Sequence, residues 1–432
     1  MLNINTALRK LDEAGKHINI GLVGAGQMGR GIVTQVFHMK GMRIPIIANS
    51  TVSKARETYQ LAGVDSKDIV VTNSVSEAEN AIKGGKFVVT EDFEVVTKVA
   101  QVDVVIEATG VPEIGSQTAL KTIHNGKHIV MLNVETDATV GPLLKKKADS
   151  AGVVYTGSAG DEPGAIKELY DFADAVGFNV IAVGKGKNNP LNRDATPDSL
   201  RQQAQEKGIN PRMLTSFVDA TNTMIELTAI SNAIGFVPSR RGLIGPSAKL
   251  QDLPKLFSLK EHGGILDRYQ VVDYIMGIAP GVFAIVRSEN PIIRDTMKYI
   301  SMGDGPNYVL YRPFHLVCIE TPLSAARAFL YNEPTIAPPG APVSETVAVA
   351  KKDLKAGEYL DGIGGYTVYG IIDTAENARK DNAVPIGLIN DRTLVKTDVK
   401  KGETISYDMV KLDEDSTVLQ LRRLQDRTFK LK

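Results

Sequence analysis

The stretch "GLVGAGQMGRG" spans Gly21–Gly31 and directly follows the apolar strand pattern "HINI". Its glycines have the spacing G-x-G-x-x-G, and a helical pattern over residues 27–40 comes after them. In a βαβ unit this order directs backbone N–H groups and a helix dipole at a pyrophosphate. The stretch therefore predicts a dinucleotide site, with a purely structural glycine turn as the alternative. The candidate residues are Gly24, Ala25, Gly26, Gln27, Met28 and Gly29.

Short β-rich runs alternate with helical patterns from residue 17 to about 160. Runs such as "VVIEA" and "HIVML" lack polar alternation, which is typical of parallel strands buried on both faces. We therefore expect an α/β fold in which an N-terminal Rossmann domain, residues 1–160, contains a doubly wound parallel sheet. The expected strands are Ile18–Val23, Arg43–Ala48, Asp68–Thr72, Phe87–Thr90, Asp103–Ala108, His128–Leu132 and Val153–Thr156.

The pattern changes after the predicted Rossmann domain. Long amphipathic helices and strands such as "GVFAIVRSE" over residues 161–314 predict a central α+β domain. The proline-rich stretch Asn332–Pro342 predicts a linker, because repeated proline stops helices and favours extended chain. Two similar phrases follow it, "VAVAKKDLKAGEYLDG" and "TLVKTDVKKGETISYDMV", which predict a small all-β module over residues 341–432.

Composition narrows the classes of partner and compartment. Basic and acidic side chains balance at 50 each in 432 residues, so no net field attracts nucleic acid or an anionic membrane. The single cysteine, Cys318, excludes intramolecular disulfides and fits a reducing cytoplasm. The chain shows neither an apolar signal core nor a run long enough to span a membrane, so we expect a soluble cytoplasmic protein.

The end of the second predicted strand favours NADP(H) over NAD(H). An NAD-specific site places Asp or Glu there to bind the adenosine ribose. Here Asn49, Ser50 and Thr51 offer neutral donors, and Lys54 and Arg56 follow. A 2′-phosphate would meet positive charge there, with a solvated helix face as the alternative explanation for the two cations.

The ends of two later strands are expected to face the nicotinamide half of the cofactor. The phrases "EATG" and "NVET" lie at the carboxyl ends of strands, where ligands of doubly wound sheets bind. They supply the candidates Ala108, Thr109, Gly110, Asn133 and Glu135.

Two lysines in the central domain are candidates for proton transfer. "VIAVGKGKNNPLNRD" places Lys185 and Lys187 on an expected glycine-flanked turn. A lysine held near another cation has a lowered pKa and can relay protons. A chance surface turn is the alternative.

One long helix is expected over "PRMLTSFVDATNTMIELTAISNAIG". It would carry Thr215, Asp219, Asn222 and Glu226 along one stripe, opposite an apolar side. Such a stripe suits either a polar cleft or a solvated face. In a cleft, Asp219 and Glu226 would act as acid–base groups or hold a divalent ion.

Cationic side chains and histidines complete the set of candidates. Arg240, Arg241 and Arg312 can each grip phosphate or carboxylate oxygens, although a structural role is the commoner explanation for any one arginine. The six histidines show no ligand spacing, which argues against firmly bound zinc or iron. The metal ligands are therefore unknown, and Mg²⁺ or Mn²⁺ shared with a substrate stays open.

The order of these segments resembles a homoserine dehydrogenase. The resemblance rests on "GLVGAGQMGRG", "GKGKNN", "SFVDATNTMIE" and "GDGPNYVLYRPFHLVCIETPLSAARAFL". It implies that residues of about 315–340 return to complete the nucleotide domain, with Glu320 and Thr321 at the cofactor. The C-terminal phrases are similar to SAF domains, and the combination resembles the branch that includes deoxyxylulose-phosphate-reductoisomerase-like (DRL) enzymes.

That resemblance implies a cytoplasmic homodimer that uses NADPH, with a central domain for catalysis and dimerisation. It implies rearrangement and reduction of 1-deoxy-D-xylulose 5-phosphate to 2-C-methyl-D-erythritol 4-phosphate, an isoprenoid precursor. The arginines would hold phosphate, and the two lysines would polarise oxygens or move protons. Asp161, Asp219 and Glu226 would anchor a metal or act as bases.

Two other functions stay open at this stage. A dehydrogenase for homoserine or another hydroxy acid needs a carboxylate clamp and no phosphate site. A non-catalytic NADPH-binding sensor would use its SAF module to recognise a sugar or a partner. A densely polar cleft argues against the sensor.

Overall fold

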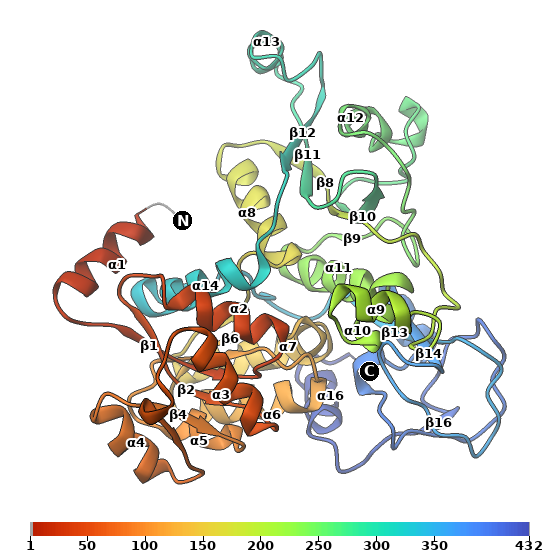
Figure 1. Ribbon diagram of the computed structural model, residues 1–432. Coiled ribbons are helices and arrows are strands. Elements are labelled where there is room, and N and C mark those ends of the chain that lie inside the picture. Colours follow the sequence, from red (N-terminus) through yellow and green to blue (C-terminus); the bar gives the residue numbers. More distant parts are fainter. Residues whose placement is uncertain (1–2, 432) are drawn as a thin grey trace. The chain divides into compact units, whose positions relative to one another are not determined.

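The computed structural model describes residues 3–431, and the chain divides into two compact units (Figure 1). Unit 1 comprises Met1–Asp161, Leu316–Pro339 and Ser416–Thr428. Unit 2 comprises Glu162–His315, Gly340–Asp415 and Phe429–Lys432. Both units are therefore assembled from segments far apart in the sequence.

Unit 1 contains one seven-stranded sheet in the order β3-β4-β2-β1-β5-β6-β7, and every pair in it is parallel. Apolar side chains cover both faces of its central strands, as the unbroken hydrophobic runs predict. The prediction of a Rossmann-type α/β fold is confirmed. The strands are β1 (Ile18–Val23), β2 (Met42–Ala48), β3 (Ile69–Val71), β4 (Phe87–Thr90), β5 (Val104–Glu107), β6 (His128–Met131) and β7 (Tyr155–Gly157).

Helices connect the strands of unit 1 and cover its sheet (Figure 1). Helix α14 comes from the distant segment after residue 315 and packs against α2 and strands β5 and β6. The helices are α1 (Ile4–Glu13), α2 (Gln27–Val36), α3 (Val52–Leu61), α4 (Val75–Lys83), α5 (Phe93–Lys98), α6 (Pro112–His124), α7 (Val134–Ala151), α14 (Val317–Tyr331) and α16 (Thr417–Thr428).

Helix α16 joins unit 1 although it belongs to the C-terminal end of the chain. Glu113 of α6 accepts the backbone N–H groups of Thr417 and Val418 at 2.9 and 3.0 Å. Pro142 interrupts the backbone bonding of α7, and Gln425 of α16 compensates. Its side chain accepts from Leu143 N at 3.1 Å and donates to Thr139 O at 3.3 Å. The Gln425 side chain thus satisfies two backbone groups of α7 close to the proline.

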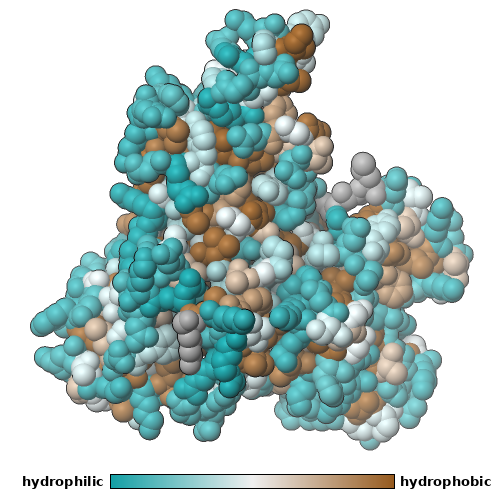
Figure 2. All heavy atoms as spheres, turned by 180° about the vertical axis from the view of Figure 1, so that it is seen from behind, coloured by the Kyte–Doolittle hydropathy of each residue, from teal (hydrophilic) through white to brown (hydrophobic). Residues whose placement is uncertain are grey.

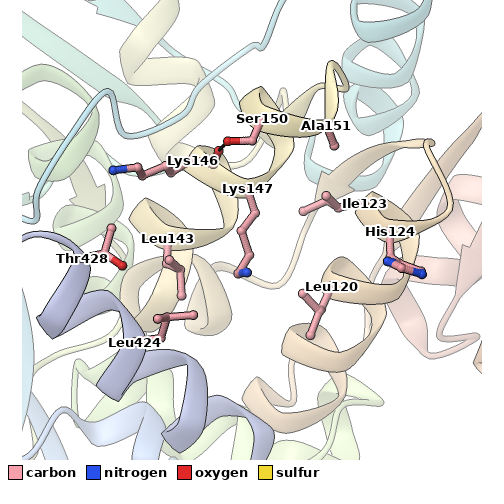
Figure 3. A pocket seen from close by; sticks show the side chains of 10 residues that line it. All are labelled: Leu120, Ile123, His124, Leu143, Lys146, Lys147, Ser150, Ala151, Leu424 and Thr428. Carbon is pink, nitrogen blue, oxygen red and sulfur yellow. Dashed lines mark hydrogen bonds between the residues drawn. The ribbon is translucent and has the colours of Figure 1, made fainter.

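An open groove of about 560 Å³ lies between α6, α7 and α16 (Figure 3). Figure 3 shows the Lys147 side chain directed between the three helices, near Leu143 and Leu424. The residues of α6 and α7 that line the groove belong to the C-terminal halves of these helices, near His124 and Ala151. Those halves lead toward the amino ends of the strands, so the groove lies away from the edge where doubly wound sheets bind nucleotides.

Unit 2 contains a mixed five-stranded sheet in the order β12-β11-β8-β10-β9. The central strand β8 pairs in parallel with β10 and in antiparallel fashion with β11. The strands are β8 (Asn179–Lys187), β9 (Val237–Pro238), β10 (Val271–Met276), β11 (Val282–Arg287) and β12 (Asn307–Arg312).

The helices of unit 2 differ from the prediction at one important place. The single helix expected over residues 211–235 is two helices, α10 and α11, separated at Asp219 and Ala220. Ala220 has φ 68°, a left-handed conformation that no continuous α-helix contains. The helices are α8 (Glu162–Ala175), α9 (Arg201–Lys207), α10 (Pro211–Val218), α11 (Thr221–Ile234), α12 (Leu253–Leu256), α13 (Pro291–Tyr299) and α15 (Ala375–Lys380).

Residues 340–415 cluster with the central residues of unit 2. Strands β13 (Ser344–Ala350) and β14 (Val368–Thr374) form an antiparallel pair, and both contact α11. A second short pair, β15 (Leu394–Val395) with β16 (Val410–Lys411), follows. The C-terminal β-rich segment is therefore packed against a helix that the sequence marks as a candidate site.

Hydrophilic residues predominate on the face drawn in Figure 2, with smaller hydrophobic areas between them. Among residues 3–431, no helix has the length and apolar character that crossing a membrane requires.

Candidate functional site

The glycine loop of unit 1 joins β1 to α2 and has the backbone geometry of a nucleotide cradle. Gly24 has φ +104°, and a Cβ atom there would lie 2.8 Å from the carbonyl oxygen of Ala108. A Cβ on Gly29 would lie 2.0 Å from Gly24 O, so side chains are excluded at both positions. Gly26, at the N-terminus of α2, has no atom within 4 Å of such a Cβ. Two glycines thus close the loop, and the third leaves space where a pyrophosphate can approach.

Asn49, at the end of β2, braces this loop. Its Oδ1 accepts from Ala25 N at 2.9 Å, and its Nδ2 donates to Thr51 O at 2.9 Å. Ser50, Thr51 and Arg56 are exposed, and residues 49–56 include no carboxylate. The structure therefore brings the candidates after β2 next to the glycine loop, with Asn49 as its support.

The ends of β5 and β6 add two acids of unusual character. Glu107 is fully buried, and its Oε2 has no hydrogen-bond partner, whereas Oε1 accepts from Thr109 N at 3.0 Å. Burial raises the pKa of Glu107 to about 7 and that of Glu135 to about 7. Asn133 caps α7 by accepting from Thr136 N at 3.0 Å. Acids that hold a proton near neutral pH repel an anionic cofactor less than ionised ones do.

Two further cofactor candidates lie on α14 and bond within unit 1. Thr321 is fully buried, and its hydroxyl pairs with that of Ser158 at 2.7 Å. Glu320 accepts from Leu316 N at 2.9 Å, inside the first turn of the helix. The Thr321–Ser158 pair attaches the returning helix to the rest of the unit, whereas the Glu320 bond lies within the first turn. Direct contact of either side chain with a cofactor stays a prediction.

In unit 2, Lys185 and Lys187 lie in strand β8, and both are buried. The expectation of a glycine-flanked turn was wrong because the strand continues through Lys187, and the burial of both lysines also excludes the alternative of a chance surface turn. Successive side chains of a strand point to opposite faces, so the two lysines share one face and Gly184 and Gly186 the other. A Cβ on Gly184 would lie 1.9 Å from Asp273 O, and one on Gly186 would lie 2.5 Å from Ala279 N. The glycines permit close packing behind the lysines.

Lys185 lies between two carboxylates, Glu162 at the start of α8 and Glu226 of α11, and its ammonium group bonds to both. The carboxylate oxygens of Glu162 and Glu226 lie within 4.8 Å of one another. Burial opposes ionisation of Glu162, but Lys185 and His315 outweigh it and lower its pKa. Burial and then the charge of Glu162 raise the pKa of Glu226 to about 8. One acid is therefore an anion, and the other can hold a proton.

Lys187 and His315 extend this lysine–carboxylate cluster, which we define as Lys185, Lys187, Glu162, Glu226 and His315. His315 Nε2 lies 3.5 Å from Glu162 Oε1. Lys187 Nζ donates to Phe217 O at 2.7 Å. Burial and the charge of Lys185 lower the pKa of Lys187 to about 8. The two carboxylates instead raise the pKa of Lys185 above its ordinary value despite its burial, so the predicted lowering falls on Lys187 alone.

The predicted polar stripe is divided by the helix break. Asn222 and Glu226 share one face of α11, and Asn222 Nδ2 donates to Glu226 Oε1. Asp219 lies outside α11 and pairs with Lys351 at 2.9 Å. Asp161 is the last residue of unit 1 and precedes Glu162 in the chain. The structure thus brings Glu226 and Asn222 to Lys185 and gives Asp219 a different set of partners.

The three arginines have different surroundings. Arg241 Nη1 lies 2.8 Å from Asp373 and 2.8 Å from Asp381, so two carboxylates already offset its charge. Arg240 Nε donates to Leu243 O at 2.8 Å. Arg312 pairs with Glu168 at 3.0 Å and stacks on the Phe314 ring at 4.6 Å. The pairing of Arg241 weakens its prediction as a phosphate ligand.

Sequence reasoning missed Glu162 as a partner of Lys185 and Glu107 as a buried acid. "GDEPG" contains two adjacent acids at the start of a helix, and only Asp161 was selected from it. A helix start after a strand is a common place for a functional acid, which was the available signal. No local pattern indicates that Glu107 is buried without a partner for one oxygen, because that depends on neighbouring strands.

Comparison with known proteins finds similarity to oxidoreductase domains. Residues 24–156 match the family model of the homoserine dehydrogenase NAD-binding domain, and residues 160–321 match that of the oxidoreductase DRL catalytic domain. A homoserine dehydrogenase from Methylobacillus glycogenes is 29% identical over 143 residues, which are 32% of this chain and 30% of that protein. The match therefore spans less than a third of that relative's length.

Two solved structures show weaker likeness. A DOX-P reductoisomerase in complex with magnesium is 17% identical with a TM-score of 0.42, over 74% of this chain and 70% of that one. A probable dehydrogenase from Thermotoga maritima is 11% identical with a TM-score of 0.35, over 96% and 88% of the two chains. Neither likeness bears on the reaction of this chain.

The glycine loop and the matched domains define a nicotinamide-dependent oxidoreductase. More specifically, residues 24–156 are similar to a homoserine dehydrogenase NAD-binding domain and residues 160–321 to the oxidoreductase DRL catalytic domain. Because both matched models describe oxidoreductases, the alternative of a non-catalytic sensor is not retained.

Proposed function

We propose that this enzyme is an NADPH-dependent reductoisomerase that converts 1-deoxy-D-xylulose 5-phosphate to 2-C-methyl-D-erythritol 4-phosphate, an isoprenoid precursor. The reaction consumes one NADPH and one proton and releases NADP⁺. The match of residues 160–321 to the DRL catalytic domain supports it. The observation that carries it is the buried lysine–carboxylate cluster, in which Lys185 bridges Glu162 and Glu226.

The cluster supplies the groups that the rearrangement of a hydroxyketone requires. The ammonium of Lys185 stabilises negative charge that develops on a substrate oxygen. Glu226, whose pKa is about 8, can donate a proton near neutral pH. Lys187, also with a pKa of about 8, can accept or return a proton at the same pH. Two groups with pKa values near the working pH suit a reaction in which protons leave one oxygen and reach another.

The residues present fit a divalent cation. Glu162 and Glu226 offer hard oxygen ligands within 4.8 Å of one another, and another acid, Asp161, directly precedes Glu162. Glu226 would bind such a cation as the carboxylate anion, after losing its proton. We propose that Glu162 and Glu226 hold Mg²⁺ or Mn²⁺ there. Such an ion polarises carbonyl and hydroxyl oxygens when bound.

The preference for NADPH over NADH is also a proposal. It rests on the absence of a carboxylate from residues 49–56 and on the exposed cation Arg56. We expect Arg56→Ala to raise the Kd for NADPH about tenfold, which is about 1.4 kcal/mol, and to leave that for NADH within a factor of about two. Equal effects on both cofactors would contradict the proposal.

Four further features stay proposals. They are a SAF domain over residues 341–432, a cytoplasmic location, a homodimer, and phosphate binding by Arg240, Arg241 and Arg312. For the homodimer, helix α13 supports the proposal because Ile292 and Tyr299 are 72% and 87% exposed. The two residues are seven positions apart and share one face of α13, and contiguous exposed apolar patches mark interaction sites. Light scattering that finds a monomer at micromolar concentration would reject it.

The second candidate is a dehydrogenase for homoserine or another hydroxy acid, which the homoserine dehydrogenase relative supports. One assay separates the two candidates by following NADPH absorbance. The substrates are deoxyxylulose phosphate with Mn²⁺ or Mg²⁺ and, in a second cuvette, aspartate semialdehyde.

Oxidation with the first substrate alone, abolished by chelation, is the expected result. Oxidation with the second alone would replace the reductoisomerase by the dehydrogenase.

A further inference from the structure

Helix α11 presents a second polar row besides the one that contains Asn222 and Glu226. Thr221, Thr228 and Asn232 are separated by seven and four residues, so they return to nearly the same face. At about 100° per residue, Glu226 lies roughly 140° around the axis from this row. One face of the helix therefore serves the cluster, and another is available for attachment.

The C-terminal hairpin of β13 and β14 occupies that second face through hydrogen bonds. The hydroxyls of Thr228 and Thr346 pair at 2.8 Å. Asn232 Oδ1 accepts from Val343 N at 2.7 Å and from Ser344 N at 2.9 Å. Near the start of α11, Gly370 N donates to Thr221 Oγ1 at 2.8 Å, and Ser231 and Ser344 pair through their hydroxyls at 2.6 Å farther along. The bonds run almost the whole length of the helix, so they define its rotation as well as its position.

The start of α11 is held by a buried ion pair. Lys351 directly follows β13, and its Nζ donates to Asp219 Oδ2, Ala195 O and Gly365 O, each at 2.9 Å. The other oxygen of Asp219 accepts from Thr221 N at 2.9 Å. All three N–H bonds of the ammonium group and both carboxylate oxygens are therefore used. They enclose the left-handed residue Ala220, from which α11 takes its direction.

We infer that Lys351 is a positioning residue: with the β13–β14 hairpin, it sets the start and rotation of α11 and so places the Glu226 carboxylate beside Lys185. The catalytic part of this inference rests on the proposed function. A buried ion pair adds little net stability compared with apolar residues of similar volume. Its distinctive property is directional bonding, which suits the fixing of a helix whose Glu226 side chain must reach Lys185 of strand β8.

The test uses Lys351→Met in the full chain, with Lys352→Met as the matched control at the neighbouring, exposed lysine. Hydrogen–deuterium exchange with mass spectrometry compares peptides from α11 with peptides from strands β8 and β10. In Lys351→Met, we expect exchange at residues 219–232 to become faster by a factor about ten times larger than any change in strands β8 and β10. With deoxyxylulose phosphate and Mn²⁺, kcat should fall about 10–100-fold, because small displacements of a catalytic group cost that much. The Kd for NADPH should change less than about twofold, because the glycine loop is in unit 1.

Uniformly faster exchange throughout unit 2 would overturn the inference, since Lys351 would then stabilise the unit without positioning α11. Unchanged exchange at residues 219–232 would overturn it as well. If the parent enzyme does not turn over deoxyxylulose phosphate but the local change in exchange occurs, the proposed function fails and the positioning role stands.

If Lys351→Met does not fold, the double variant Ser344→Ala and Thr346→Val replaces it. It removes two hydroxyl pairs to α11 without leaving a buried charge. Faster exchange confined to α11 supports the inference, and exchange equal to that of the parent enzyme overturns it.

Discussion

Lys185 and Lys351 are both buried lysines of unit 2 that pair with carboxylates, yet their surroundings differ in kind. Lys351 meets one carboxylate and two backbone carbonyls, and each bond is 2.9 Å long. Lys185 meets two carboxylates that compete for one ammonium, and a second lysine lies two residues away on the same face. The first arrangement uses every donor of the ammonium group once, whereas the second has two members, Glu226 and Lys187, whose pKa values are about 8.

The comparison shows that burial of a lysine by itself does not indicate catalysis. A lysine whose donors all end on fixed partners holds a backbone in place. Around Lys185 two pKa values converge for different reasons. Burial and the charge of Glu162 raise the pKa of Glu226 to about 8, and burial and the charge of Lys185 lower the pKa of Lys187 to about 8. Such convergence is a better sign of proton transfer than the residue types are.

The largest effect that would sharpen this difference is expected for Lys185→Met. Removing the ammonium takes away the charge that stabilises a developing oxyanion and brings two carboxylates into direct repulsion. We expect kcat with deoxyxylulose phosphate to fall about 10²–10⁴-fold. NADPH binding, measured by fluorescence titration, should stay within about twofold of the parent value because the cradle is in unit 1. Turnover that stays at the parent rate would remove Lys185 from the mechanism.

The next effect concerns stability and the other lysine. Lys351→Met leaves the Asp219 carboxylate buried and unpaired, which we expect to cost about 3–5 kcal/mol. Adding Asp219→Asn removes the unpaired charge while keeping an oxygen for Thr221 N–H, so the double variant should recover at least half of the loss. Urea unfolding followed by far-UV circular dichroism measures both. A double variant as unstable as the single one would show that charge balance is not what distinguishes this site.

The smallest effect is a shift in titration. The ¹³Cε signal of Lys187, assigned with Lys187→Arg, should titrate with a midpoint near pH 8, as its pKa of about 8 requires. Because that pKa is lower in the folded than in the unfolded chain, burial of protonated Lys187 opposes folding below pH 8, and this cost disappears as pH rises to the ordinary lysine pKa.

Replacing Lys185 by Met should move the Lys187 midpoint upward, because the charge of Lys185 is the second cause of its lowered pKa. The same substitution at the exposed Lys352 should leave the midpoint where it is. A Lys187 midpoint at the ordinary lysine value in the parent enzyme would contradict the comparison, since the charge of Lys185 would then not lower the pKa of its neighbour.

The sheet of unit 1 and the glycine loop were predictable from the amino-acid pattern alone. Hydrophobic runs and glycine spacing are local properties, and a backbone that admits no Cβ at Gly24 and Gly29 must have glycine there. The same locality explains why both lysines of β8 were found, since "GKGK" interrupts an apolar strand.

Which polar side chains pair with one another became visible only in the tertiary structure. The break at Ala220 separates Asp219 from Asn222 and Glu226, although helical periodicity places all of them on one stripe. Asp219 instead meets Lys351, 132 residues later in the chain. Glu162 meets Lys185 because α8 and β8 pack together. Charge pairing falls off with distance in space and not along the chain, so no local pattern can assign such partners.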